Sequence, residues 1–547
     1  MRDAVQMAVP EMAHRPSAFG EKRQAMRATR AEKLAAFALV AIGYAAYGVQ
    51  ADLPWRVSGD ALSRVANAAM VTLGRHPHLG AIGLVWNPLP SLMELPLTLL
   101  RPLWPALVTR GEAGVLAGAF MAALGMVFLL DLLAFLGIGR GHRCVWAFLY
   151  ALNPLIFIYG VNGMSDLMLM SALMGSLAGV VGYLRQGNLR LLASGGIWLA
   201  LALGFRYEAV PLAMALAFGM ALGMRLAKEA WPKILGTTVI LLTPIVFAGF
   251  VWILLNALIM KNPLYFLDSV YSNAAQLATG SYAAQTLAAS FHHPLTALRN
   301  SFSFAVLFWP LIPAFGAALI LGVLRRRDPL ALTLVATLTA VPVLQAAMLD
   351  LGRTALWDRF FISNIPIGFA LVAYAATSLG RGSARRQVFL AIATLLLAAG
   401  DLGTGVALTS SPVYGKDDGS TLSDILKGRL PPSQMAVETA PVIAYLDAHP
   451  HLTVLTDTFT SFPIVISVEN PDRLVITSDP DFQSILQNPA GRVDAILVPR
   501  PSGVADLDAV NRQWPSLWAG NVPWAHLLVS FRAGDRFRIY RVGIGAP

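Results

Sequence analysis

The chain has 547 residues, of which 56% are hydrophobic and only 13% are charged, and its mean hydropathy is +0.60. A soluble globular protein carries roughly twice that share of charged residues, so these values exclude a soluble chain and indicate a membrane protein. The single cysteine, Cys144, excludes a disulfide framework and a cysteine-based metal cluster. The net charge of +10 does not indicate nucleic-acid binding, because Arg and Lys cluster in short loops between apolar runs.

Residues 1–33 are polar and basic, and no cleavage-site pattern precedes the first apolar run. We therefore expect a cytoplasmic tail that is retained, rather than a signal peptide. Crossing a bilayer takes about 20 apolar residues as a helix. Such runs predict about eleven spans within a membrane domain of residues 34–404. In chain order they are 34–52, 113–137, 143–161, 166–184, 189–205, 208–225, 234–258, 302–323, 329–348, 360–379 and 386–404.

Positive charge predicts which ends of these spans face the cytoplasm. Six basic clusters fall on one side of the alternating spans, and by the positive-inside rule that side is the cytoplasm. They are the tail, Arg140 and Arg143, Arg185 and Arg190, Arg225, Lys228 and Lys233, Arg325 to Arg327, and Arg381, Arg385 and Arg386. The other side receives three long segments, 51–112, 261–301 and 405–547. The richness in Ala, Arg and Gly suits a bacterial source, so together with the spans and the charge pattern we expect a multi-pass protein of a bacterial inner membrane with its N-terminus in the cytoplasm.

Residues 405–547 differ in character from the spans. Short apolar runs predict strands at 452–456, 464–468, 474–476, 495–498 and 536–542, and helices at 435–448 and 505–519. Strands that alternate with helices indicate a small α/β or α+β domain, which the charge pattern places outside the cytoplasm. No glycine-rich phosphate loop or nucleotide-binding motif occurs in it.

The first outer segment, 51–112, is long for a connection between spans and is rich in polar residues. Between Trp55 and Pro96 it holds Asp60, Arg64, Arg75, His76, His78 and Glu94. Apolar residues from Ala61 to Leu73 have helical spacing, which predicts a helix along the membrane surface. Either Ser58 or Asp60 would cap that helix. The alternative for Asp60 is a carboxylate that deprotonates a hydroxyl, and composition alone favours the cap.

The order of features in this segment resembles that of GT-C glycosyltransferases, in particular the protein O-mannosyltransferases and the lipid A aminoarabinose transferases. In that branch an acidic motif opens the loop, a surface helix follows, and a Lys-Pro-Pro-Leu-like segment comes next. This chain has GDALSR, a surface helix, HPHLGAIG and WNPLPSLMELPL in the same order. The resemblance covers about residues 30–404. Ala61 stands where the family often has a second acid and Asn87 where it has a basic residue, so a divergent branch is indicated.

The resemblance implies a polytopic helical fold and a sugar donor linked to polyprenyl phosphate in the outer leaflet. It implies that Asp60 is the general base acting on an acceptor hydroxyl of a glycan, lipid or protein, with inversion of the sugar, and this outweighs the cap. No cofactor is expected, although a divalent cation is compatible with the superfamily. His76 and His78 lack a third ligand nearby, so they indicate sugar or phosphate contact as readily as a metal site.

The leaving polyprenyl phosphate would require Arg or Lys at the outer ends of spans. Arg359 lies in RFFISNIP, which is similar to a family segment beside the lipid phosphate, and we prefer that role to simple contact with headgroups. For Arg206 both interpretations stay open, whereas headgroup contact is favoured for Arg353. Arg64 and Lys261 are further candidates for donor binding.

Two further features have open interpretations. Asp166, in the short turn before the fourth span, is either a helix cap or a second acid that orients the acceptor or holds a cation. Glu208 is expected to be the local partner of Arg206. The second outer segment, with Tyr265, Tyr271 and Tyr282, is either a flap over the site or an interfacial anchor.

Two other functions fit a polytopic chain. A transporter or lipid flippase would also have basic cytoplasmic loops, but it typically shows internal repeats and charges at the bilayer midplane. Here no repeat is found and the distinctive charges lie at the outer boundary. A scaffold or sensor would not need the first outer segment, with its acids and histidines. The ranking is enzyme, transporter, scaffold.

Overall fold

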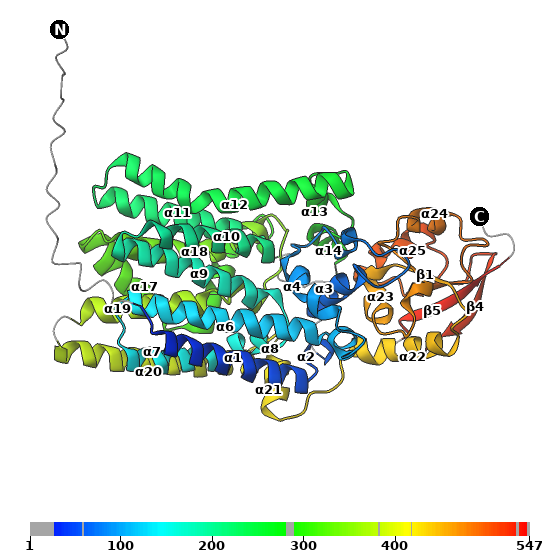
Figure 1. The fold of residues 1–547 in the computed structure, drawn as a ribbon, viewed down its shortest axis with the longest axis horizontal. Helices are drawn as coiled ribbons and strands as arrows, with labels where there is room; N and C mark the ends of the chain where they lie inside the picture. The colour runs from blue at the N-terminus through cyan, green and yellow to red at the C-terminus, as the bar shows by residue number, and fades with distance from the viewer. Residues whose placement is uncertain are drawn as a thin grey trace, which may run out of the picture.

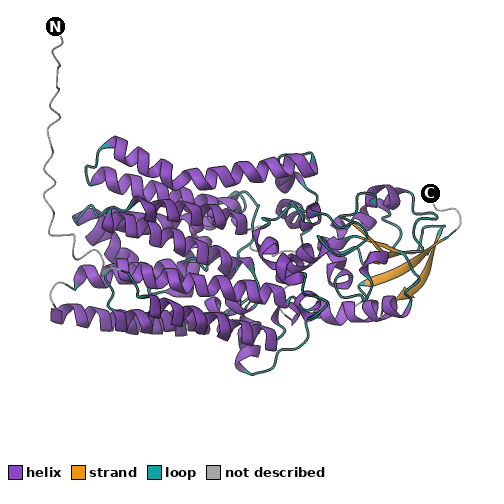
Figure 2. Cartoon of the chain, in the orientation of Figure 1, coloured by secondary structure: helices purple, strands orange, loops and turns teal. Residues whose placement is uncertain are grey.

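The computed structural model of the chain is a bundle of long apolar helices followed by a small sheet, and the two lie end to end (Figures 1 and 2). The structure describes residues 27–56, 59–280, 289–380, 383–416, 418–531 and 535–543. Residues 434–543 are here called the sheet region. The end of the bundle that faces this region is called the sheet end.

Eight helices in the described residues are long and apolar enough to cross a membrane. They are α1 (Arg30–Gln50), α6 (Glu112–Phe135), α9 (Ser165–Gln186), α11 (Ala209–Leu226), α12 (Trp231–Met260), α18 (Pro329–Asp350), α19 (Asn364–Leu379) with the preceding turn η5 (Asp358–Phe361), and α20 (Ser383–Ser410). The apolar window of α9 is 94% buried by other helices, whereas that of α12 is only 17% buried. Helix α9 therefore lies inside the bundle, and α12 presents most of its apolar surface outward, as a lipid-facing helix does.

The other three predicted spans are also helical, but two of them are bent. The span 143–161 consists of α7 (Arg140–Leu152) and α8 (Pro154–Val161), which meet at 66°. Asn153 caps α8 there, and Pro154 lacks the N–H that would continue α7. The span 302–323 lies within Pro294–Phe308 and Leu311–Arg325, which meet at 103° beside Pro310.

The second bent span contains α16 (Pro294–Ser303), η3 (Phe304–Phe308), α17 (Leu311–Ala317) and η4 (Ala318–Arg325). The span 189–205 is α10 (Leu189–Phe205), with 17 residues. Among the described residues there are up to ten spans if each bent pair crosses once. The predicted figure of about eleven holds only if the shorter α10 crosses as well.

Two long connections lie at the sheet end. The first long loop, residues 51–111, contains α2 (Leu53–Arg56), α3 (Gly59–Met70), η2 (Leu79–Ile82), α4 (Leu89–Thr98) and α5 (Ala106–Thr109). The second long loop, residues 261–293, contains α13 (Tyr265–Asp268) and α14 (Asn273–Ala278). After α20 the chain passes through α21 (Gly419–Leu426) into the sheet region.

The predicted helix at Ala61 to Leu73 is present as α3, but its apolar face is covered by protein rather than by the membrane surface. On one side Leu62, Ala66 and Ala69 belong to a core that includes Val442 and Leu446 of the sheet region. On another side Val65 packs with Leu107 and Ala113 at the start of α6. The surface-helix interpretation was wrong in this respect, because helical spacing reports an apolar face and not what covers it.

The sheet region has five strands in the order β2-β1-β3-β5-β4. The strands are β1 (Val454–Thr456), β2 (Leu474–Ile476), β3 (Ala495–Pro499), β4 (Ala525–Ser530) and β5 (Phe537–Val542). The helices are α22 (Gln434–Ala448), α23 (Thr458–Val465), α24 (Phe482–Gln487) and α25 (Ala509–Gln513). Two short turns, η6 (Pro471–Arg473) and η7 (Gly503–Leu507), complete the region. β1 pairs in parallel with β2 and β3, with Val454 opposite Leu474 and Ala495. β5 runs antiparallel to β3 and β4.

Three predictions in this region were wrong or incomplete. The run 464–468 is not a strand but the end of α23 and the turn after it, because Asp457 caps a helix there by accepting from the Phe459 N–H. The helix predicted at 505–519 is reduced to α25 and the preceding turn η7. Strand β4 was not predicted; it lies at the edge of the sheet, where Leu527 and Leu528 remain exposed.

Candidate functional site

Asp60 and Arg359 lie 299 residues apart in the sequence and form an ion pair at the sheet end of the bundle. Asp60 is in the first turn of α3, and its Oδ2 accepts a 2.9 Å hydrogen bond from Nη1 of Arg359. Arg359 lies in η5, where its backbone N–H donates to the carboxylate of Asp358 over 2.7 Å. The guanidinium lies 5.0 Å from the ring of Trp357 and 5.7 Å from that of Phe360, so aromatic faces fix its position.

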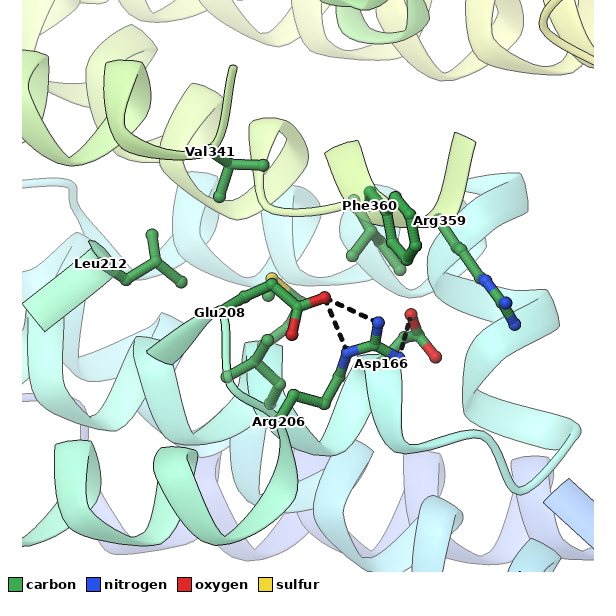
Figure 3. Close-up of a pocket in the computed structure, with 10 residues that line it drawn as sticks. Asp166, Arg206, Glu208, Leu212, Val341, Arg359 and Phe360 are labelled. Carbon is green, nitrogen blue, oxygen red and sulfur yellow. Dashed lines mark hydrogen bonds and ion pairs between the residues drawn. The ribbon is translucent and has the colours of Figure 1, made fainter. Parts of the chain in front are cut away.

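Arg206 joins the same cluster from the turn between α10 and α11. Its guanidinium forms ion pairs with Asp166 at 2.9 Å and with Glu208 at 2.7 Å, as Figure 3 shows. The ring of Phe360 lies 5.6 Å from the Arg206 guanidinium, so this ring contacts both arginines of the site. The expected pairing of Glu208 with Arg206 is confirmed.

Asp166 lines the same small pocket as Arg206, Glu208, Arg359 and Phe360 (Figure 3). The helix-cap interpretation of Asp166 was wrong, because the cap position of α9 is Met164 and no side chain caps this helix. The second carboxylate oxygen of Asp166, Oδ2, is buried and has no hydrogen-bond partner in the part of the chain that the structure describes. The pocket is therefore lined by two arginines, Arg206 and Arg359, and by one buried carboxylate oxygen that could accept a hydrogen bond from a substrate.

Arg64 lies one helical turn after Asp60 on α3, so the two side chains share a face. Its Nη1 donates to the Asn87 carbonyl over 3.2 Å, and its guanidinium lies 5.7 Å from the ring of Trp86. The segment WNPLP thus holds Arg64 through its backbone and through an aromatic face. No basic side chain at position 87 is needed for this contact.

Three arginines determine the charge state of Asp60. Loss of water to the surrounding protein raises the pKa of the Asp60 carboxyl, although its side chain remains open on one side. The charge and hydrogen bond of Arg359, together with the charges of Arg64 and Arg206, lower the pKa by more than this. The pKa of Asp60 is therefore below its ordinary value, and the group is a carboxylate at neutral pH. The Asp60 side chain is 67% exposed, so a hydroxyl can reach it. Asp60 is not at the cap position, because α3 already begins at Gly59, and its side chain pairs with Arg359 instead; Ser58 lies outside the described residues.

Other predicted site residues lie elsewhere. His76 is 3.8 Å from Asp481 of the sheet region, which also pairs with Arg75, and the Nδ1 of His78 contacts the His76 carbonyl. Within the described residues, Lys261 and Arg353 form no ion pair, and no group of three or more His, Cys, Asp or Glu side chains could hold a metal ion. The structure therefore brings together Asp60, Arg64, Asp166, Arg206 and Arg359, but not His76, His78, Lys261 or Arg353.

The sequence did not point to a second acidic cluster behind Arg359. Asp418, which precedes α21, accepts a 2.7 Å hydrogen bond from the Tyr159 hydroxyl and also contacts the side chain of Asp358. Burial raises the pKa of Asp418. The adjacency of Asp358 to Arg359 was visible in the sequence, but the approach of Asp418 depends on how the chain folds back after α20.

Glu94 is the most isolated acid of the first long loop. It is fully buried in α4, and neither carboxylate oxygen has a hydrogen-bond partner among the described residues. Burial raises the pKa of Glu94 well above its ordinary value of 4.5, and the charge of Arg64 offsets only part of this effect. Glu94 is therefore expected to be protonated in the folded protein at neutral pH.

This state predicts a pH-dependent effect of Glu94→Gln on thermal stability. Below pH 4.5 both folded and unfolded chains hold the Glu94 proton. As the pH rises above that value, the unfolded chain releases the proton while the folded chain keeps it, so the wild type loses stability until the folded pKa is reached. Glutamine does not titrate. In detergent, the melting temperature of the variant relative to the wild type should rise as the pH increases above 4.5; a difference that is constant with pH would contradict a buried, protonated Glu94.

The fold was compared with those of known proteins. No protein-family model matches the chain, and no curated protein matches it in sequence. Two solved structures are similar: crystal structures of ArnT from Cupriavidus metallidurans, one bound to undecaprenyl phosphate and one in the apo state. The TM-score is 0.54 for both, the identities are 12% and 13%, and each match covers 93% of this chain and 98% of the other. The predicted GT-C-like architecture is confirmed, and the chain has the fold of ArnT over nearly its whole length.

Proposed function

We propose that this chain is a membrane glycosyltransferase that moves a sugar from a polyprenyl-phosphate-linked donor to an acceptor hydroxyl. The observation that carries this proposal is the contact between Asp60 and Arg359, which joins a candidate base to a candidate phosphate-binding group. Arg64 and Arg206 add positive charge around the same carboxylate. The ArnT fold supports the proposal, since one of its structures is bound to undecaprenyl phosphate, the chemical class of the expected leaving group.

We place the reaction on the outer face of a bacterial inner membrane. The basic clusters of the sequence belong to the connections at the opposite end of the bundle, such as those between α9 and α10 and between α11 and α12. By the positive-inside rule that end faces the cytoplasm. The sheet end, with the site and residues 405–547, then faces outward, where lipid-linked donors would meet their acceptors.

The proposed reaction is a single displacement with inversion. The acceptor oxygen attacks the anomeric carbon, its proton passes to the Asp60 carboxylate, and the bond from that carbon to the phosphate oxygen breaks. The polyprenyl phosphate leaves with the bonding electron pair, and the guanidinium groups of Arg359 and Arg206 stabilise its growing negative charge. The Nε of Arg359 is a buried donor without a hydrogen-bond partner among the described residues, so it can donate to an incoming phosphate.

The ion pair of Asp60 and Arg359 also implies an order of binding. While the pair is closed, one oxygen of the Asp60 carboxylate accepts from Arg359 and is a weaker base. A donor phosphate that binds Arg359 would compete for this guanidinium and release the carboxylate toward the acceptor. We therefore propose that the donor binds before the acceptor, which prevents Asp60 from acting on an acceptor in the absence of a donor.

The proposal is tested with the purified wild-type chain in lipid nanodiscs. Polyprenyl phosphates that carry mannose, arabinose or aminoarabinose are supplied in turn, and free polyprenyl phosphate and released or transferred sugar are measured. We expect turnover of at least one donor. The sugar of that donor then shows whether the chain is a hexosyltransferase or a pentosyltransferase. If the chain turns over none of these donors but moves labelled lipid across liposome membranes, it is a transporter or flippase instead.

A further inference from the structure

The second long loop contacts three separate parts of the molecule within a few residues. The ring of Phe266 in α13 stacks on that of Tyr207 at 5.4 Å, and Tyr207 lies between the site residues Arg206 and Glu208. Asn273, at the start of α14, donates to the Arg353 carbonyl over 3.3 Å, in the segment that leads to Arg359. The loop therefore rests on both turns that supply the arginines of the pocket.

The third contact joins this loop to the sheet region. The hydroxyl of Tyr271, between α13 and α14, donates a 2.8 Å hydrogen bond to Oδ2 of Asp457. The Tyr271 ring packs against Phe459 at 5.0 Å between centroids, and the guanidinium of Arg512 lies 5.7 Å from the same ring. In Figure 1, α14 accordingly lies beside the sheet region near α23 and α25.

Asp457 is a rigid anchor for this contact. It directly follows β1, is fully buried, and accepts hydrogen bonds from the Phe459 N–H at 2.9 Å, the Ala509 N–H at 2.6 Å and the Thr477 hydroxyl at 2.6 Å. With Tyr271 this makes four donors to one carboxylate. The four donors compensate the buried charge, so the Asp457 carboxylate has little freedom to move.

Asp457 lies at the carboxyl end of β1, which is the part of such a sheet where ligands commonly bind. β1 is followed in the chain by β2 on one side of it, whereas its other neighbour, β3, is followed by β4 on the far side of the sheet. The chain therefore leaves the carboxyl ends of the adjacent parallel strands β1 and β3 in opposite directions. In open sheets of this kind, ligands bind in the crevice beside that point. In this chain the side chain of Tyr271 from the second long loop lies at the carboxyl end of β1, where it binds Asp457. The sheet region thus holds a segment of its own chain where related sheets hold a ligand.

From these contacts we infer that Tyr271 is a positioning residue through which the sheet region holds the second long loop against the donor pocket. A donor with a long lipid tail must pass this loop to enter and leave, and the loop must close to exclude water from the reacting sugar. The bond from Tyr271 to Asp457 stabilises the closed arrangement. The activity part of this inference rests on the proposed glycosyltransferase function, whereas its structural part does not.

The test compares Tyr271→Phe with Tyr265→Phe in the full-length chain. Both changes remove one hydroxyl from the second long loop, but in the described residues the Tyr265 hydroxyl makes no hydrogen bond. Loss of a hydrogen bond to a charged group should increase hydrogen–deuterium exchange of residues 265–279 by roughly tenfold or more in Tyr271→Phe. Tyr265→Phe should exchange like the wild type. Unchanged exchange in Tyr271→Phe would overturn the inference, whatever the activity of the chain.

Activity gives a second readout. In Tyr271→Phe, water should compete better with the acceptor, so the ratio of free to transferred sugar should rise while the melting temperature falls little. A higher exchange rate with an unchanged ratio would show that the loop is held by Tyr271 but does not shield the sugar, which overturns the shielding role. If the wild type itself turns over no donor, the proposed function fails, and the exchange experiment still decides whether Tyr271 fastens the loop.

Discussion

Replacement of Asp60 by asparagine is expected to lower the rate of sugar transfer by a factor of about 10²–10⁴, the usual contribution of a general base. Asparagine has nearly the same shape, and its amide oxygen can still accept from Arg359, so the site should keep its geometry. It cannot take a proton from the acceptor hydroxyl. The loss should therefore appear in kcat, measured with saturating donor and acceptor in nanodiscs, and donor affinity should change little.

Asp52→Asn is the matched control for this experiment. Asp52 also lies in the first long loop and also pairs with an arginine, but its partner is Arg110, at 2.8 Å, and not Arg359 of the site. Its backbone has a φ of 51°, a conformation that asparagine tolerates well, so the fold should not suffer. Asp52→Asn should retain nearly full activity. If Asp60→Asn is as active as this control, Asp60 is not the base.

The contrast between bundle and site shows what a sequence can predict here. Every predicted span is helical in the structure, two of them as bent pairs, because a bilayer imposes a similar length and composition on each segment that crosses it. Strands β1, β2 and β3 were also predicted, because each is a short, buried apolar run, and β5 was predicted from apolar residues that alternate with arginines. The run 464–468 was not distinguishable from a strand, since short apolar runs occur in both structures.

The candidate site could be predicted only in its composition. The resemblance of the first outer segment suggested Asp60, and residue types at the outer ends of spans suggested Arg206 and Arg359. Their pairing depends on segments that are far apart in the sequence and on the crossing of the helices. The dependence on contacts between distant segments also explains why the position of His76 was predicted wrongly. His76 was interpreted as a possible substrate contact because it lies in the same loop as Asp60, whereas the fold turns it toward Asp481 of the sheet region. Proximity in sequence was informative only over a few residues, as for Arg64 beside Asp60 and for Glu208 beside Arg206.

Replacement of Arg359 by alanine should lower kcat/KM for the donor by about 10²–10³, the effect of removing one group that stabilises developing negative charge. The loss has two physical sources. The leaving phosphate loses a guanidinium that lies near the rings of Trp357 and Phe360, and the buried Nε donor without a hydrogen-bond partner among the described residues is lost with it. Arg359→Lys keeps a positive charge but not the two-pronged donor, so its activity should lie between those of alanine and arginine.

The same substitution also predicts a change in pH dependence, which separates a role in the site from a role in folding. The positive charge of Arg359 lowers the pKa of Asp60, so its removal should raise that pKa. The acidic limb of the rate profile, where the base becomes protonated, should then move to higher pH in Arg359→Ala. Arg353→Ala removes an exposed arginine from the same segment and should change neither the rate nor the limb. A uniform loss of activity at every pH in Arg359→Ala, or an equal loss in Arg353→Ala, would indicate damage to the segment rather than loss of a charge beside Asp60.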